Sequence, residues 1–151
     1  MNTRIYNARI LTMEEGRDIF EGELWIEGDT VTYAGPAKDA AGKTWDQEIN
    51  AEKNLIMPGF KDAHTHSAMT FLRSHADDMK LDEWLNDRVF PAEAKLTDDD
   101  VYWHTKLAVM EYLTSGITSI FDMYMHRAAG ARAVEEAGFR NVFCESINNF
   151  G

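Results

Sequence analysis

A short sequence, Met57-Pro58-Gly59-Phe60-Lys61-Asp62-Ala63-His64-Thr65-His66, determines how the rest of this chain is interpreted. It follows the apolar pair Leu55-Ile56, which favours a strand, and it ends in two histidines that are one residue apart. Side chains alternate between the two faces of a strand, so an extended chain is predicted to carry Asp62, His64 and His66 on one face. Two neutral imidazoles on one face can share a metal ion, although a complete site needs further ligands. An isolated pair of this kind is otherwise more typical of a solvated loop.

The residues around the two histidines carry a family resemblance. Pro58-Gly59-Phe60, followed by His64-Thr65-His66, resembles the metal-binding first strand of the amidohydrolase superfamily. The continuation, with Glu83-Trp84-Leu85 and Pro91-Ala92-Glu93, is similar to the branch that contains methylthioadenosine/S-adenosylhomocysteine deaminases and related chlorohydrolases. The resemblance covers essentially the whole chain. It implies a zinc- or iron-dependent hydrolase on a (β/α)8 barrel, with a small β-sandwich built mainly from the two ends of the chain.

Roles for individual residues follow from this resemblance. His64 and His66 are expected to be the first ligands of one divalent metal ion, zinc or alternatively iron. Glu93 is expected to accept hydrogen bonds from ribose hydroxyl groups, and Trp84 to line the substrate pocket. Without the resemblance, Glu93 is interpreted as a surface residue and Trp84 as a packing residue. The family's other metal ligands, two histidines and an aspartate, and its proton-transfer residues fall beyond these residues, so no catalytic residue is predicted in this segment.

Two helices are predicted after the histidines. Residues 81–88 have helical character, and Pro91 is expected to break that helix. Thr97 is expected to cap a longer helix, in which Asp98-Asp99-Asp100 stabilise the positive end of the helix dipole. Apolar residues of this helix recur at helical spacing and are predicted to share one face: Trp103, Leu107 and Met110.

Strands and helices alternate through the rest of the chain. A buried strand is predicted over Ile117–Met123, a helix over 127–137 that ends at Gly138, and a strand over 141–146. This order favours a parallel α/β sheet covered by helices, with the functional residues at the carboxyl ends of the strands. Residues 57–151 are therefore interpreted as the first three strands and helices of a metal-dependent (β/α)8 barrel. The barrel is incomplete here, because a whole one takes about 250 residues.

Residues 1–56 are predicted to form a small antiparallel β-sandwich segment, with a turn at Gly28-Asp29. Strand patterns cover residues 4–13, 22–27, 30–34 and 44–51. Aromatic residues in short strands usually fill a core, so three of them are interpreted as core residues rather than as a ligand-stacking surface: Trp25, Tyr33 and Trp45.

The composition narrows the possible partners. With 44% hydrophobic and 27% charged residues the chain has a globular composition, and its formal net charge of −11 argues against nucleic acid and anionic membranes. The lone Cys144 excludes an internal disulfide framework and is interpreted as a small buried side chain, which fits a cytoplasmic location. The expected partner is a small-molecule substrate, and a homo-oligomer is possible.

These observations lead to a functional hypothesis with alternatives. The chain is interpreted as the N-terminal part of a metal-dependent amidohydrolase that deaminates an adenosine-like nucleoside or another nitrogen heterocycle, and the 151-residue segment alone is expected to be inactive. The alternatives are a chlorohydrolase or amide hydrolase on the same scaffold, or a non-catalytic truncated module. Glu145 departs from the arginine of the family pattern, and its charge is predicted to disfavour homocysteine-bearing substrates. His126 is expected either to contact the substrate or to be an ordinary loop residue, whereas no metal role is expected for His75 or His104.

Overall fold

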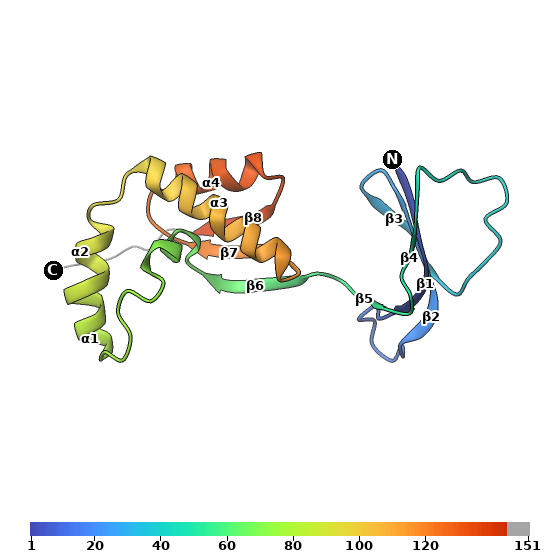
Figure 1. Cartoon of the computed structure of the whole chain (residues 1–151), viewed down its shortest axis with the longest axis horizontal. Helices are drawn as coiled ribbons and strands as arrows, with labels where there is room; N and C mark the ends of the chain where they lie inside the picture. Colours follow the sequence, from blue (N-terminus) through green and yellow to red (C-terminus); the bar gives the residue numbers. More distant parts are fainter. Residues whose placement is uncertain (145–151) are drawn as a thin grey trace. The chain divides into compact units, whose positions relative to one another are not determined.

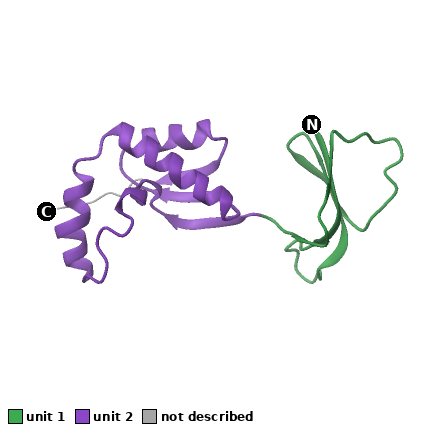
Figure 2. Ribbon diagram, viewed as in Figure 1, with its two compact units in different colours: residues 1–58 green, residues 59–151 purple. Residues whose placement is uncertain are grey.

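The computed structural model describes residues 1–144. The chain divides into two units, Met1–Pro58 and Gly59–Gly151 (Figure 2). The first unit is built from β-strands, and the second contains three parallel strands with helices (Figure 1). Across the described residues, no helix combines the length and the apolar character needed to cross a membrane.

The sheet of the first unit is mixed. It contains the strands β1 (Asn2–Ile10), β2 (Phe20–Glu27), β3 (Thr30–Gly35), β4 (Gln47–Asn50) and β5 (Leu55–Ile56). Strands β1, β2 and β3 pair antiparallel, whereas β4 and β5 both run parallel to β1. The predicted antiparallel sheet is therefore wrong for β4 and β5. The loop after β3 returns the chain to the beginning of β1, where the N–H of Asp46 donates to the carbonyl of Asn2, so β4 starts in the same direction as β1.

An aromatic cluster centred on Trp25 forms the core of this unit. Trp25 is 4% exposed, and its ring centroid lies 4.7 Å from that of Tyr33 and 5.3 Å from that of Trp45. The interpretation as a core residue is confirmed for Trp25, whereas Tyr33 and Trp45 are half-buried and pack against it. Beside the cluster, Glu23 is fully buried, and its Oε2 accepts hydrogen bonds from Nε and Nη2 of Arg4 at 2.9 and 2.6 Å. The arginine compensates a carboxylate that has lost its contact with water.

The second unit has the predicted parallel sheet. Its strands are β6 (Phe60–Thr65), β7 (Ile117–Met123) and β8 (Arg140–Cys144), paired in that order. Helices α3 (Asp98–Thr114) and α4 (Arg127–Glu136) connect the strands and lie over one face of the sheet (Figure 1). A short 3-10 helix, η1 (Ser67–Leu72), follows β6 directly. The end of the strand predicted over 141–146, including Glu145, lies outside the described residues.

Within the described part of the chain, the helices bury one face of this sheet. Side chains from α3, β7, α4 and the start of β8 form the core there: Val109, Ile120, Val134 and Phe139. Large apolar side chains of β7 and β8 remain exposed on the other face: Phe121, Met123 and Val142. Strand β7 was predicted to be buried throughout, but its residues alternate between buried and exposed, because the helices cover one side only.

The helix predicted to end before Pro91 continues through it. It begins as α1 (Leu81–Trp84), widens to a π-type stretch η2 (Leu85–Val89) and ends as α2 (Phe90–Glu93). Proline normally interrupts a helix because it lacks an N–H and its ring meets the carbonyl four residues earlier. The widened turn directly before Pro91 changes that spacing and accommodates the ring, so the predicted break is wrong.

The face of helix α3 that is buried is not the face that was predicted to be apolar. The buried residues of this helix are Val101, Thr105, Ala108 and Val109. The residues predicted to share an apolar face, Trp103, Leu107 and Met110, are all exposed in the described part of the chain. Small and β-branched side chains therefore make the close contact of α3 with η1, β7 and α4.

The predicted cap of α3 is confirmed. Thr97 Oγ1 accepts a hydrogen bond from the N–H of Asp100 at 3.2 Å, and Asp100 Oδ2 accepts one from the N–H of Thr97 at 2.9 Å. This reciprocal pair satisfies two backbone donors at the start of the helix. The bonds from Thr97 lower the pKa of Asp100 below its usual value. Their contribution to stability is therefore present at neutral pH and is lost as the pH falls through the lowered pKa.

Thr97→Ala is expected to lower the free energy of unfolding by about 1 kcal/mol, the usual cost of removing a helix cap. Urea unfolding followed by circular dichroism measures this change. Thr114→Ala is the matched control, because it removes a threonine hydroxyl that bonds only to the carbonyls of Met110 and Glu111 within the same helix. Equal losses for the two variants would contradict a capping role for Thr97.

Candidate metal centre

Strand β6 contains a bulge just before its second histidine. Asp62 pairs with Ile120 and Thr65 pairs with Asp122, so three steps along β6 match two steps along β7. Ile120 and Asp122 are both buried on the side covered by α3 and α4, and residues that pair across strands share a face. Asp62 and Thr65 therefore both lie on the helix-covered face, and the alternation of side chains is interrupted between them.

His64 and His66 lie on the opposite, open face of the sheet, on either side of Thr65. Their ring centroids are 5.0 Å apart, with the ring planes at 81°. His64 is exposed and His66 is half-buried. The sequence predicted that the two histidines share a face, and the structure agrees. The prediction that Asp62 shares this face is wrong, because the extra residue of the bulge reverses the alternation between Asp62 and His64.

The hydrogen bond of His66 fixes which of its ring nitrogens is free. Nδ1 lies 2.7 Å from the carbonyl oxygen of Met123, at the carboxyl end of β7. A carbonyl oxygen only accepts hydrogen bonds, so Nδ1 carries a proton, and in the neutral ring Nε2 then keeps its lone pair. Metal-binding histidines almost always donate their second nitrogen in this way. The orientation of the His66 ring is thus set by this hydrogen bond.

The described residues contain two candidate metal ligands, His64 and His66. Within residues 1–144, no group of three or more His, Cys, Asp or Glu side chains is arranged to hold a metal ion. The two imidazoles fit zinc and iron, which both accept nitrogen donors, and they fill two of the four positions of a tetrahedral zinc site. The donor chemistry of His64 and His66 therefore fits the implied metal, and their number leaves its coordination incomplete.

A group of polar side chains lies behind the histidines. Tyr112 Oη, from α3, is 2.6 Å from Thr65 Oγ1 and 3.0 Å from Ser67 Oγ. The N–H of Ser67 donates to Oδ1 of Asp122 at 3.1 Å, and Asp122 is 1% exposed. Burial raises the pKa of both Asp122 and Tyr112 above their usual values, against the opposing effect of the hydrogen bonds from Ser67. Both neighbours of His66 are thereby tied to the packed side of the sheet.

Glu93, the predicted ribose-binding residue, is buried at the end of α2. It is 7% exposed, and its Oε1 accepts a hydrogen bond from Tyr124 Oη at 2.8 Å. Burial, together with the bond to Glu93, raises the pKa of Tyr124 far above its usual value. Tyr124 follows β7 and packs in a core cluster with Ala68, Val101 and Ala129. The Glu93 carboxylate is therefore held against the core that contains Ala68, close in sequence to His66.

The remaining candidates lie apart from the two histidines in the hydrogen-bond network. Trp84 is half-buried at the end of α1, and among the described residues no hydrogen bond joins it to His64, His66 or Glu93. Outside this group, His126 Nδ1 lies 2.6 Å from Oδ1 of Asp98, which connects the start of α4 to the start of α3. The ring of His104 packs 5.4 Å from Phe71, and its Nδ1 is 3.3 Å from Thr70 Oγ1.

Several residues of this region have no role that the sequence alone predicts. Hydroxyl residues on both sides of a candidate ligand, as Thr65 and Ser67 are, could serve as a signal for supporting hydrogen bonds. Asp122 and Tyr124 are recognisable only as residues near the end of a predicted strand. Tyr112 gives no local signal, because it lies 45 residues from Ser67 in the sequence and meets it only after α3 has packed on the sheet.

Two ligand-type histidines at the end of the first of three parallel strands, backed by helices, define the class of this chain. Residues 55–149 match the amidohydrolase family, and the chain belongs to that family. It is 40% identical over 148 residues to the 5-methylthioadenosine/S-adenosylhomocysteine deaminase of Symbiobacterium thermophilum, a match that covers 97% of this chain and 34% of the relative. The chain thus spans about a third of the length of the curated relatives it matches.

Solved structures of amidohydrolases have the same fold. An adenosine deaminase from Xanthomonas campestris with bound zinc is similar with a TM-score of 0.86 and 28% identity, over 93% of this chain and 33% of that one. The zinc complex of the atrazine chlorohydrolase TrzN from Arthrobacter aurescens TC1 is similar with a TM-score of 0.84 and 17% identity, over 99% of this chain and 36% of that one. At 17% identity the second likeness concerns the fold alone.

Proposed function

We propose that this chain is the N-terminal part of a metal-dependent amidohydrolase that deaminates an adenosine-like nucleoside or a related nitrogen heterocycle. His64 and His66 bind one divalent ion, zinc or alternatively iron, and ligands from elsewhere in the protein complete its coordination. The observation that carries this proposal is the 2.7 Å hydrogen bond from His66 Nδ1 to the carbonyl of Met123, which leaves Nε2 free on the face shared with His64. The similarity to a 5-methylthioadenosine/S-adenosylhomocysteine deaminase and to an adenosine deaminase supports the reaction class.

The proposal extends to the fold of the whole protein. Residues 57–151 form the beginning of a (β/α)8 barrel, with β6, β7 and β8 as its first three strands, and residues 1–56 contribute to a β-sandwich. The exposed apolar side chains on the open face of the sheet support this assignment, because closure of a barrel converts such a face into a filled interior: Phe121, Met123 and Val142. A cytoplasmic location and a homo-oligomeric state stay predictions.

The residues of this chain prepare the site for hydrolysis. A divalent ion held by His64 and His66 would supply Lewis acidity and would lower the pKa of a water molecule, the chemistry that hydrolysis of an electron-poor ring carbon needs at neutral pH. His64 and His66 are neutral donors and leave the charge of the ion undiminished. The carbonyl of Met123 keeps the proton of His66 on Nδ1, away from the coordinating nitrogen. Asp122 lies on the packed side of the sheet, where it holds the backbone of Ser67.

Glu93 and Trp84 are the proposed substrate-binding residues. A carboxylate can accept two hydrogen bonds from the neighbouring hydroxyl groups of a ribose, and the bond from Tyr124 fixes the direction of the Glu93 carboxylate. Trp84 offers an apolar wall for the substrate. Glu145, outside the described residues, is proposed to disfavour substrates that carry a carboxylate of their own.

The proposed reaction is tested by substrate profiling of a protein that contains this chain and has the full length of its relatives. Purified protein is assayed with adenosine, methylthioadenosine, adenine and a chlorotriazine, and the release of ammonia and of chloride is measured along with the zinc and iron content. Ammonia release from the nucleosides is expected. Chloride release without ammonia would replace deamination by the chlorohydrolase alternative, and metal-free, inactive protein would support the non-catalytic alternative.

The 151-residue chain by itself is expected to bind zinc weakly, with a dissociation constant above the micromolar range, because two imidazoles leave half of a tetrahedral coordination shell to water. Isothermal titration calorimetry with zinc chloride measures this affinity. His75→Ala, a change in an exposed loop residue, serves as the control. Submicromolar stoichiometric binding that disappears in His64→Ala would show instead that this chain builds a closed site.

A further inference from the structure

A single tyrosine contacts the residues on both sides of His66. Tyr112 Oη lies 2.6 Å from Thr65 Oγ1 and 3.0 Å from Ser67 Oγ. A hydroxyl group can donate one hydrogen bond and accept others. Tyr112 can therefore donate to one of the two hydroxyl groups and accept from the other at the same time. The hydroxyl group therefore bridges the backbone segment that carries the candidate ligand.

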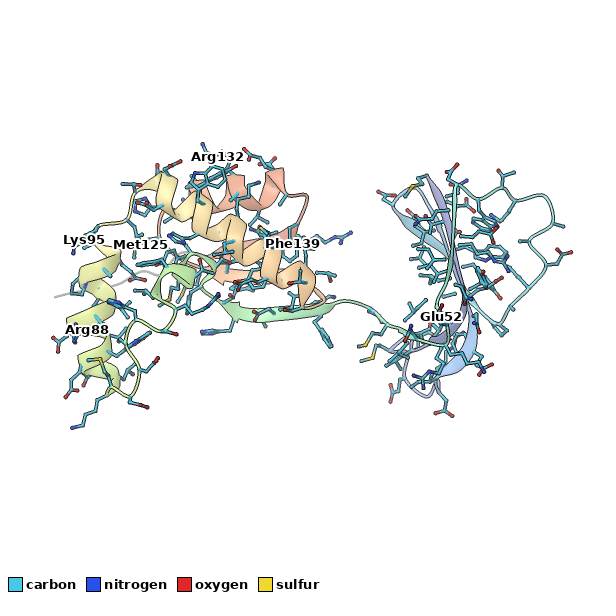
Figure 3. All side chains as sticks on the ribbon, in the orientation of Figure 1. Glu52, Arg88, Lys95, Met125, Arg132 and Phe139 are labelled. Carbon is cyan, nitrogen blue, oxygen red and sulfur yellow. The ribbon has the colours of Figure 1, made fainter. Side chains whose placement is uncertain are left out.

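The position of the Tyr112 ring is set by packing. Its ring stacks on that of Phe139, with centroids 5.9 Å apart and planes at 21°. Phe139 is labelled in Figure 3. Tyr112 also packs against the core cluster formed by α3, β7 and α4, which holds the ring at a fixed depth below the sheet. The hydroxyl group thus reaches β6 from a rigid element, which is what a positioning group requires.

Asp122 secures the same segment from the neighbouring strand. Its Oδ1 accepts the hydrogen bond of the Ser67 N–H at 3.1 Å, and the next residue of β7, Met123, accepts the bond from His66 Nδ1. These contacts hold the backbone after His66 and the ring of His66 against the same strand. Thr65, before His66, pairs with Asp122 through the sheet, and Tyr112 adds a hydrogen bond to the Thr65 side chain.

We infer that Tyr112 is a positioning residue for His66. By bridging Thr65 and Ser67, its hydroxyl group keeps the His66 ring in the orientation that places Nδ1–H on the Met123 carbonyl and leaves Nε2 unprotonated on the open face. This inference rests on the proposed role of His66 as a metal ligand. It adds a group on a different element, which touches neither the metal nor the substrate and acts through the ligand's own backbone.

The test reads the His66 tautomer by nitrogen-15 NMR of the imidazole rings in the metal-free 151-residue protein, at a pH where the rings are neutral. Wild type is expected to show His66 mainly as the Nδ1–H form. Tyr112→Phe removes only the hydroxyl group and is expected to shift His66 toward the Nε2–H form, because the segment around it can relax away from the Met123 carbonyl. An unchanged His66 tautomer in folded Tyr112→Phe would overturn the inference.

Tyr102→Phe is the matched control. Tyr102 lies on the same helix, and its hydroxyl group donates to Glu136 at 2.5 Å on the side of α3 where Arg132 of α4 stacks on the Tyr102 ring (Figure 3). Its removal is expected to leave the His66 tautomer unchanged. If Tyr112→Phe does not fold, Ser67→Ala replaces it, since this change removes one of the two bridged hydroxyl groups; a smaller shift is expected, and no shift would overturn the inference.

Metal affinity separates this inference from the proposed function. In a protein of the relatives' full length, Tyr112→Phe is expected to raise the dissociation constant for zinc about 10–100-fold, the usual effect of removing a group that supports a ligand. Wild-type protein that binds neither zinc nor iron would defeat the proposed function while leaving the tautomer result intact. Wild-type binding with an unaltered affinity in Tyr112→Phe would defeat the inference alone.

Discussion

Replacement of His66 by alanine, in a protein with the relatives' full length, is expected to remove bound metal and hydrolytic activity together. The change deletes an imidazole whose Nε2 faces the site and whose Nδ1 is held by the Met123 carbonyl. Without it the ion would lose a neutral donor, and the pKa of a water molecule at the site would rise toward its value in bulk water. Activity is therefore expected to fall to the level of the uncatalysed reaction. Metal content by plasma mass spectrometry and kcat/KM for adenosine give the two readouts.

Two companion variants make this result specific. His64→Ala removes the second imidazole on the same face and is expected to have the same effect. His126→Ala removes an imidazole that is bound to Asp98 between α3 and α4, and it is expected to retain metal and activity. A His66→Ala protein that loses its metal but keeps its activity would contradict the proposed metal-dependent mechanism.

The second large effect is expected for Glu93→Gln, which keeps the volume of the side chain and an oxygen able to accept from Tyr124 but removes the negative charge. Hydrogen bonds to a charged group contribute about 1.5–3 kcal/mol. If Glu93 binds a ribose, kcat/KM for adenosine and methylthioadenosine should fall roughly 10- to 150-fold. Adenine, which lacks the sugar, should be affected far less. Steady-state kinetics on the three substrates measure the difference.

The burial of Glu93 makes a control necessary. Because Glu93 is 7% exposed and bound to Tyr124, a change there could also disturb the core around Ala68. A purely structural disturbance would lower kcat/KM for adenosine and adenine by the same factor. Glu83→Gln, an exposed carboxylate earlier in the same helical stretch, should change neither value. Equal losses for the two substrates in Glu93→Gln would therefore remove Glu93 from the ribose site.

Local sequence signals account for much of the fold. The cap at Thr97 and strand β7 both depend on neighbouring residues, and the structure has both of them. The continuation of the helix through Pro91 could not be predicted. A proline in the sequence indicates a helix break, and the sequence carries no signal for the widened turn that accommodates this one. The pairing of β4 and β5 with β1 depends on the course of a loop, which the strand patterns do not specify.

The candidate site also contains residues that the sequence predicts and contacts that it does not predict. His64 and His66 are recognisable because their spacing and flanking residues are local. The partner of His66 is a backbone carbonyl 57 residues away, and the bridge made by Tyr112 joins residues that are 45 and 47 positions apart. Such contacts exist only after the sheet and α3 have packed, so no pattern along the chain indicates them. The wrong face predicted for Asp62 has the same origin, since a bulge depends on how β6 pairs with β7.

The bulge between Asp62 and Thr65 also bears on how this strand can evolve. Asp62, before the bulge, lies on the face that packs against the helices. His64 and His66 lie on the open face. Asp62 and Thr65 are both paired with β7, so the number of residues between them sets the orientation of His64 and His66. The identity of Ala63 matters less. Substitutions can accumulate at this position while the histidines keep their face, whereas insertion of one residue would disturb their alignment. For this strand, the number of residues constrains the orientation of the imidazoles as well as their identity does.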